Sequence, residues 1–254
     1  MAFVLVGLFA STATQTKASP PPGTWTLVWN DDFNGTDLDS TKWSRGPRTG
    51  DIIPGELQGY VPENVTVANG LCTIKVEKRP CSNTGKNGDT GGPRDYASGC
   101  IETYGKFTQT YGYIEARIRA ATGPGTWPAI WLMPDRGAPN GVYYRTQVGD
   151  YVSHDSVSCP MGNEIDILEY MQTWKNQTTG YSQGHCGYIW QYGVGASSDW
   201  TMVGQLYSPD TTFHTYGVAW SPGRLDYYID GTKVSTKYGR SSVSVCPEYL
   251  IINC

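Results

Sequence analysis

The middle of the chain reads Tyr113-Ile114-Glu115-Ala116-Arg117-Ile118-Arg119, a strict alternation of apolar and polar side chains. Successive side chains of a strand point to opposite faces, so Ile114, Ala116 and Ile118 share one face and the polar residues share the other. One apolar and one polar face is typical of a half-buried strand. This stretch predicts a sheet that packs one face on a core and turns the other to water.

The same pattern recurs along most of the chain. Short alternating runs occur at residues 71–77, 213–220 and 225–229, and Gly, Pro, Asn and Asp separate them. Asp230-Gly231 follows the last of these runs and is a strong hairpin-turn dipeptide. Helical periodicity is hard to find. We therefore expect one all-β domain, built as a sandwich or barrel of antiparallel strands.

Composition and charge exclude several classes of partner. The chain has 254 residues and a formal net charge of -4, and its Lys and Arg residues are scattered singly. No basic patch is expected, so neither nucleic acid nor an anionic membrane is a predicted partner. The chain has 9 Trp and 18 Tyr against 5 Phe. Part of this excess fits core and strand packing, and the remainder would suit a surface that stacks on sugar rings. We expect the protein to be a monomer.

The N-terminus has the proportions of a signal peptide. Residues 3–10 are apolar and are followed by small and polar residues up to position 20. No later segment reaches the roughly 18 apolar residues needed to cross a bilayer. We expect residues 1–20 to be a signal peptide, residues 21–254 to form the domain, and the protein to be secreted.

The cysteines predict a disulfide rather than a metal site. Seven are present, and none forms a C-x-x-C pair. Cys81 and Cys100 flank a polar loop at residues 80–94 that is rich in Gly, Asn, Ser and Asp. We expect a disulfide between these two residues that closes the loop, while seven cysteines also allow many other pairings.

Three acids interrupt an apolar strand at residues 162–170, which read Gly-Asn-Glu-Ile-Asp-Ile-Leu-Glu-Tyr. Burying ionised carboxylates in such a strand is unfavourable in free energy, so their presence there indicates a functional role. Alternation places Glu164 and Asp166 on one face, looking into the same space. Glu169 breaks the alternation unless a β-bulge near Ile167 or Leu168 accommodates one extra residue.

With the bulge, Glu164 and Glu169 lie on the same face of the strand, and their side chains can approach each other. Carboxyl groups about 5–5.5 Å apart on either side of a glycosidic bond are typical of a retaining glycosidase. One of them acts as nucleophile, and the other acts as acid and then as base. The acid between them, Asp166, can share a proton or hydrogen bond with Glu164 and hold it oriented.

The run Glu-Ile-Asp-Ile-Leu-Glu resembles the E-x-D-x-x-E signature of glycoside hydrolase family 16, the laminarinase, agarase and carrageenase group. Further landmarks follow in the expected order over most of the chain. They are Trp29-Asn30-Asp31-Asp32-Phe33, Pro62-Glu63-Asn64-Val65, Trp127-Pro128-Ala129-Ile130-Trp131-Leu132, Phe213-His214-Thr215-Tyr216 and Tyr228-Ile229-Asp230-Gly231. The resemblance implies a concanavalin-like β-jelly-roll sandwich of two antiparallel sheets.

The resemblance also implies an activity. By position, Glu164 matches the family nucleophile, Asp166 the assisting acid and Glu169 the acid/base. The chain is thus expected to be a retaining, endo-acting glycoside hydrolase of a β-linked polysaccharide. A transglycosylase with the same residues stays open, because it differs only in whether sugar or water resolves the glycosyl-enzyme.

Two tryptophans and a histidine are the expected substrate contacts. Trp127 and Trp131 match the family's aromatic platform, and a spacing of four within a strand would put them on one face. Tryptophan in a strand is often core, which is the alternative for each. His185 resembles the cleft histidine that follows the catalytic strand in many relatives. A merely hydrogen-bonded strand histidine is the alternative for His185.

We expect no cofactor and no catalytic metal. The three histidines show no H-E-x-x-H pattern or paired spacing. Some relatives bind calcium away from the cleft, and Asp31 and Asp32 would be candidates there, but we do not predict the ion. Relatives continue beyond the strand at residues 250–253, whereas this chain ends at Cys254. We therefore expect a catalytic domain that is truncated at its C-terminus.

The substrate is the most open point. A β-1,3- or β-1,3(4)-glucan is favoured, because it is the commoner activity of the bulged group. A marine galactan such as agar, porphyran or carrageenan is the alternative, with sulfate esters bound by Arg45 and Arg48 or by Arg136 and Arg145. The last two lie in a long loop at residues 134–160, which we expect to border the active site. A non-catalytic carbohydrate-binding protein on the same fold is a further alternative.

Overall fold

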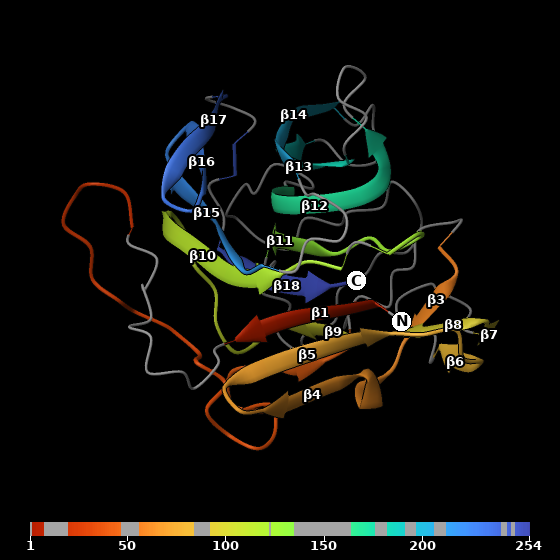
Figure 1. The fold of residues 1–254 in the computed structure, drawn as a ribbon. Coiled ribbons are helices and arrows are strands. Elements are labelled where there is room, and N and C mark those ends of the chain that lie inside the picture. The colour runs from red at the N-terminus through yellow and green to blue at the C-terminus, as the bar shows by residue number, and fades with distance from the viewer. Residues whose placement is uncertain are drawn as a thin grey trace.

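Nearly all regular secondary structure in the described part of the chain is β-strand (Figure 1). This computed structural model describes residues 2–7, 20–46, 56–83, 92–121, 123–134, 164–175, 182–190, 197–205, 212–239, 243–244 and 247–254. The single helical element among them is the 3-10 turn η1 (Pro62–Asn64). No helix within these ranges is long and apolar enough to cross a membrane.

Two seven-stranded sheets carry the fold. The first has the order β17-β16-β15-β10-β1-β5-β4, and the second has the order β14-β13-β12-β11-β18-β9-β2. The strands of the first are β1 (Ala2–Gly7), β4 (Val65–Ala68), β5 (Leu71–Val76), β10 (Gly112–Arg119), β15 (His214–Ser221), β16 (Arg224–Ile229) and β17 (Thr232–Tyr238). Those of the second are β2 (Ser44–Arg45), β9 (Cys100–Glu102), β11 (Ala129–Pro134), β12 (Glu164–Lys175), β13 (Ser182–Trp190), β14 (Ser197–Gln205) and β18 (Glu248–Asn253). Neighbouring strands within both sheets are antiparallel, as expected.

Two short pairs of strands complete the described fold. β3 (Gln58–Tyr60) and β8 (Tyr96–Ser98) pair in parallel, and β6 (Cys81–Asn83) pairs with β7 (Gly92–Arg94) in antiparallel fashion. The second pair corrects the prediction of a loop over residues 80–94, because its two ends form a hairpin. Residues 84–91 lie outside the described residues.

The core lies between the two sheets. The alternation at residues 113–119 is confirmed: Ile118 is fully buried, and Ile114 and Ala116 pack against the same cluster. Val218 from the first sheet and Ile252 from the second belong to that cluster as well. Figure 1 shows β10, β15, β16 and β17 in one layer and β12, β13 and β14 in the other. The expected jelly-roll sandwich is confirmed.

The predicted hairpin at Asp230-Gly231 is confirmed. Ile229 pairs with Thr232, so two residues close the turn. Both have positive φ, 48° for Asp230 and 75° for Gly231. Two central residues with positive φ define a turn whose twist matches that of the strands it joins, and Asp-Gly accepts that conformation readily.

The predicted disulfide is wrong. Cys81 and Cys100 are both free thiols. Cys81 lies in β6, where its Sγ contacts the Tyr96 carbonyl oxygen at 3.2 Å. Cys100 lies in β9 of the second sheet, buried in an apolar cluster with Tyr60. The two thiols thus belong to different elements with different neighbours.

The segment expected to be a leader contributes a strand. Residues Ala2–Gly7 form β1, which pairs with β5 on one side and with β10 on the other. The role of residues 1–20 as a signal peptide stays a prediction. The long loop expected at residues 134–160 lies outside the described residues except for Pro134, the last residue of β11.

Candidate active site

The acidic motif occupies the start of β12, and a β-bulge interrupts its pairing with β11. Ile130 pairs with Leu168 and the next residue, Trp131, pairs with Asp166. Ile167 therefore has no partner on β11 and is the extra residue of the bulge.

The pairing with β13 shifts at the same place. Asp166 pairs with Gly187 and Glu169 pairs with His185, so two residues of β12 oppose Cys186 alone. A classic bulge has this two-against-one count. The bulge predicted from the position of Glu169 is confirmed.

The bulge separates the apolar side chains of the motif from its acids. Ile165 and Ile167 are buried in the core between the sheets. The charge of Glu164 acts on both Asp166 and Glu169, and the charge of Glu169 acts on Asp166. The three carboxyls are thus gathered on the outer face of the second sheet, the face turned away from the core.

The environment of Glu169 keeps its carboxyl protonated up to a higher pH than that of an ordinary glutamate. Burial, followed by the charge of Glu164, raises the pKa of Glu169 from 4.5 to about 8. The Trp127 indole N–H donates to Glu169 Oε1 at 3.0 Å, and this bond lowers the pKa in part. The environment therefore keeps Glu169 protonated near neutral pH.

Asp166 is buried next to Glu164. Burial raises the pKa of Asp166 well above its ordinary value, and the charges of Glu164 and Glu169 raise it further. Neither oxygen of Asp166 accepts a hydrogen bond from a donor in the described part of the chain. The group within hydrogen-bonding reach is the Glu164 carboxyl. Two carboxyls bond only when one is protonated, which fits a proton shared by this pair.

A second apolar cluster covers part of the same outer face. The members of this outer-face cluster are Tyr60, Cys100, Tyr104, Tyr249 and Ile251. Trp131 packs against it and lies opposite Asp166 in the pairing of β11 with β12. Trp131 therefore stands between the covered part of the face and the acids.

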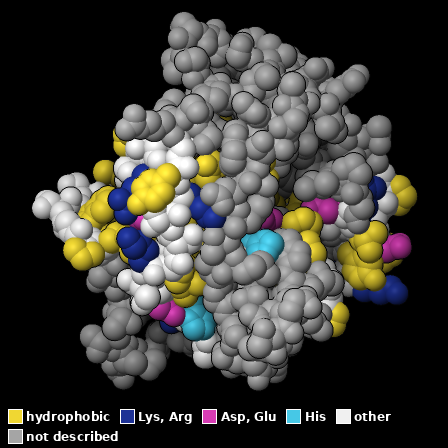
Figure 2. All heavy atoms as spheres, turned by 90° about the horizontal axis from the view of Figure 1, so that it is seen from above, with side chains coloured by type: hydrophobic (Ala, Val, Ile, Leu, Met, Phe, Trp, Pro, Cys, Tyr) yellow, Lys and Arg dark blue, Asp and Glu magenta, His cyan; other side chains and the backbone are white. Residues whose placement is uncertain are grey.

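His185 lies across from Glu169. The two residues are Cα partners in neighbouring strands, so their side chains share the outer face. Burial lowers the pKa of His185, which favours the neutral imidazole. Figure 2 shows histidine, acidic and hydrophobic side chains next to one another on the face seen from above.

The six residues predicted from the sequence therefore lie on one face, although Trp127 reaches it in a different way than predicted. Trp127 does not belong to a strand with Trp131, because β11 begins at Ala129. Its place comes from Pro128, whose carbonyl oxygen accepts a hydrogen bond from the Tyr170 backbone N–H at 3.1 Å. This bond holds the residues before β11 beside β12.

Two polar residues near the site escaped the sequence reasoning. Asn253 accepts a hydrogen bond from the Trp131 indole N–H at 2.8 Å. Glu248 is fully buried at the start of β18, where burial raises its pKa and the charge of Glu164 adds to the shift. The signal that could have found them is their position at the two ends of the apolar run 249–252.

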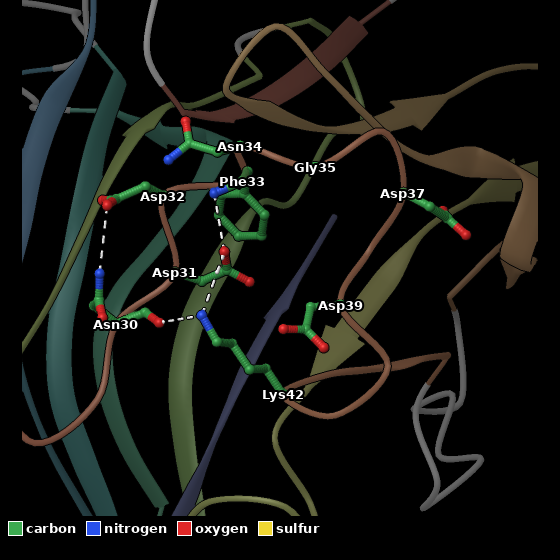
Figure 3. A pocket seen from close by; sticks show the side chains of 9 residues that line it. All are labelled: Asn30, Asp31, Asp32, Phe33, Asn34, Gly35, Asp37, Asp39 and Lys42. Atoms are coloured by element: carbon green, nitrogen blue, oxygen red, sulfur yellow. Dashed lines mark hydrogen bonds and ion pairs between the residues drawn. The ribbon is translucent and has the colours of Figure 1, made fainter.

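A cavity of about 410 Å³ lies elsewhere, in the loop before β2 (Figure 3). Its Asp31 is already occupied, since Oδ1 accepts from the Phe33 N–H at 2.9 Å and Oδ2 from the Trp43 indole at 2.8 Å. Lys42 donates to the Asn30 carbonyl oxygen across the same loop. In the described ranges, no three His, Cys, Asp or Glu side chains form a group that could hold a metal ion. The loop is thus held together by its own contacts.

The two facing antiparallel sheets and the bulged acidic strand place the chain in the class of β-jelly-roll glycoside hydrolases. The family model described as Beta-porphyranase A-D, GH16 domain, matches residues 25–247. The chain belongs to glycoside hydrolase family 16.

Curated relatives and solved structures agree with this family. The chain is 29% identical over 233 residues to Glucan endo-1,3-beta-glucosidase A1 of Niallia circulans, covering 85% of this chain and 30% of the relative. It is 26% identical over 235 residues to Keratan-sulfate endo-1,4-beta-galactosidase of Sphingobacterium multivorum, covering 89% of this chain and 48% of the relative. It thus spans less than half the length of either. The solved catalytic domain of an endo-1,3-beta-glucanase (laminarinase) from Thermotoga petrophila RKU-1 is similar, with 26% identity, a TM-score of 0.64, and coverage of 91% of this chain and 86% of the other.

Proposed function

We propose that this chain is the catalytic domain of a retaining, endo-acting glycosidase that cleaves a β-linked polysaccharide. The observation that carries the proposal is the bulge in β12, which brings Glu169 to the same face as Glu164 and Asp166. Membership in glycoside hydrolase family 16 supports it.

In the proposed first step, the Glu164 carboxylate attacks the anomeric carbon while Glu169 donates its proton to the leaving oxygen. A pKa of about 8 suits Glu169 to this role, because an acid must still carry its proton at working pH. In the second step, Glu169 takes a proton from water, and that water displaces Glu164 from the sugar. Two displacements at the same carbon give net retention.

Asp166 is proposed to keep Glu164 oriented during both steps. Its raised pKa supports a neutral Asp166 that donates a hydrogen bond to the Glu164 carboxylate. This arrangement lets one carboxyl of the cluster ionise while its neighbours stay protonated.

Trp127, Trp131 and His185 are the proposed substrate contacts. Both indole N–H groups are already engaged, one with Glu169 and one with Asn253. The tryptophans are therefore proposed to contact sugar through their ring faces and edges rather than through hydrogen bonds.

A β-1,3- or β-1,3(4)-glucan is the first proposed substrate. The names of the Niallia circulans relative and of the solved laminarinase support it. A galactan of the agar, porphyran or carrageenan type is the second candidate, favoured by the porphyranase description of the family model. Of the arginines considered for sulfate, Arg45 forms an ion pair with Asp37. Arg48, Arg136 and Arg145 lie outside the described residues.

A parallel assay tests the proposal. Reducing-end release is measured from laminarin, lichenan, agarose, porphyran and carrageenan, with Glu164→Gln as the inactive control. An endo-acting enzyme releases a ladder of oligosaccharides, and NMR of the first product shows the β-anomer if the configuration is retained. Tight binding of a polysaccharide without release of reducing ends would instead support the non-catalytic carbohydrate-binding alternative.

Export and monomeric state are also proposed. The apolar stretch at residues 3–10 supports a cleaved leader. N-terminal sequencing of secreted protein tests the leader, and size-exclusion chromatography with light scattering tests the monomer.

A further inference from the structure

Asn253 occupies the same row of the outer face as the proposed acid/base. Glu169 pairs with Ala129, and Ala129 pairs with Asn253 on its other side. Residues paired in this way across a sheet point to the same face. Asn253 is thus two strands from Glu169, about 10 Å at the usual strand spacing, with the small Ala129 between them.

A directional chain of hydrogen bonds runs through Asn253. The Trp131 indole N–H donates to Asn253 Oδ1 at 2.8 Å, and Asn253 Nδ2 donates to the Tyr60 hydroxyl oxygen at 2.7 Å. Gln58 Nε2 donates to the same hydroxyl at 3.1 Å. An indole can only donate, so the amide oxygen must face Trp131 and the amide nitrogen must face Tyr60. The contacts on its two sides thus fix the orientation of the Asn253 amide.

The Tyr60 end of this series of hydrogen bonds is held in a buried cluster. Tyr60 is buried in the outer-face cluster with Tyr249 and Ile251. Burial raises the pKa of Tyr60 well above its ordinary value, so its hydroxyl stays neutral. Trp131, by contrast, is only partly buried. The network therefore joins a rigid cluster to a ring at the border of the acidic cleft.

We infer that Asn253 is a positioning residue that fixes the Trp131 ring for stacking against the glycan, and so sets the affinity for substrate rather than the rate of chemistry. The inference rests on the proposed function. If Trp131 is held by its N–H, its ring plane is defined before the sugar arrives, which avoids an ordering cost on binding. Without Asn253, the ring gains freedom and its N–H loses a partner.

Two variants test the inference. Asn253→Leu removes both hydrogen bonds at similar size, and Tyr60→Phe removes only the hydroxyl that orients the amide. We expect Asn253→Leu to raise KM about tenfold with kcat within about twofold of wild type, since one lost hydrogen bond is worth about that factor. Tyr60→Phe should give a smaller change in the same direction. Tyr60→Phe keeps the test valid if Asn253→Leu does not fold.

Asn64→Leu is the matched control. Asn64 is a buried asparagine that donates to the Lys75 carbonyl oxygen at 2.9 Å and accepts from the Arg79 guanidinium at 2.9 Å. Its loss should lower the melting temperature while leaving KM unchanged. Quenching of tryptophan fluorescence by a bound oligosaccharide, measured in each variant, gives an affinity that is independent of turnover.

A double-mutant cycle decides whether Asn253 acts through Trp131. In a Trp131→Ala background, Asn253→Leu should change KM less than twofold, because the ring it positions is gone. An equal tenfold rise in both backgrounds overturns the inference, as does a fall in kcat with unchanged KM. If the wild type and Asn64→Leu release no reducing ends from any of the polysaccharides, the proposed function itself has failed.

Discussion

The indole N–H of Trp127 donates to Oε1 of Glu169 at 3.0 Å, so a residue expected to touch sugar also touches the proposed acid/base. Among the described residues, this bond is the one contact that lowers the pKa of Glu169, whereas burial and the charge of Glu164 raise it to about 8. A hydrogen bond from a neutral donor favours the charged form of a carboxyl. Trp127 thus limits how far the environment can raise the pKa of Glu169, and it fixes one of the two carboxyl oxygens.

This relationship predicts the pH profile of Trp127→Phe. The general acid must be protonated, so kcat/KM should fall as pH rises through the pKa of Glu169, near 8 in the wild type. Removing the indole donor raises that pKa, and the alkaline limb should move up by about 0.5–1 unit. The measurement is kcat/KM against pH from 5 to 10.

Trp131→Phe is the control for this profile. Its N–H bonds to Asn253 and not to Glu169, so its alkaline limb should coincide with that of the wild type. An alkaline limb of Trp127→Phe that stays in place or moves to lower pH contradicts the assignment of Glu169 as the acid.

Replacing each glutamate should stop a different chemical step. Glu164→Gln removes the nucleophile and Glu169→Gln removes the acid, so each should lower kcat by several orders of magnitude while the protein keeps its fold. Azide distinguishes the two roles when the substrate has a good leaving group. Glu169→Ala with azide should yield a β-glycosyl azide, because azide replaces the base-assisted water.

With Glu164→Ala, azide attacks the anomeric carbon directly, and the product should be the α-glycosyl azide. NMR of the two products is the measurement. Normal turnover by either variant, or the same anomer from both, would show that the roles are misassigned.

The raised pKa of Glu169 also predicts how stability depends on pH. Folding favours the protonated carboxyl, whose pKa is about 8 in the folded chain against about 4.3 when unfolded. The stability it contributes is fully present below about pH 4.3 and is lost as pH rises through 8. The melting temperature of the wild type should therefore fall relative to that of Glu169→Gln between pH 5 and pH 9. Parallel curves for the two proteins would contradict the raised pKa.

The elements that the sequence predicted well are those decided by local chemistry. The alternation at Ile114, Ala116 and Ile118 defines the buried face of β10 without reference to any other strand. Asp230-Gly231 defines its turn because few dipeptides accept positive φ at both positions. The bulge in β12 could be inferred because Glu169 would otherwise face the core.

The elements that the sequence missed depend on contacts between distant residues. Trp131 and Asn253 are 122 positions apart, and nothing in either neighbourhood signals that they bond. The disulfide prediction failed for the same reason, because the flanking positions of Cys81 and Cys100 say nothing of the different neighbours that each meets. Trp127 lies beside the acids for a reason other than shared strand alternation, since a backbone bond between Pro128 and Tyr170 holds it there.

The bulge itself can be tested by shortening the strand. Ile167 and Leu168 together oppose a single residue of β13, so deleting Leu168 leaves one residue against one. Regular alternation then places Glu164, Asp166 and the displaced Glu169 on the same face, as in the natural arrangement. We expect this deletion to lower the melting temperature, because Leu168 is fully buried, and yet to retain measurable hydrolysis.

Two controls separate the effect of alternation from the loss of core. Leu168→Ala keeps the bulge and removes only packing, so it should be destabilised with kcat close to that of the wild type. Deleting Ile165 also shortens β12 by one buried residue, but it turns Glu164 to the opposite face from Asp166. Reducing-end release should then be absent although the loss of apolar area is similar. The prediction is contradicted if both deletion variants fold and both are inactive. The direction in which Glu169 points would then not depend on the bulge, and the mechanism that relies on the bulge would be wrong.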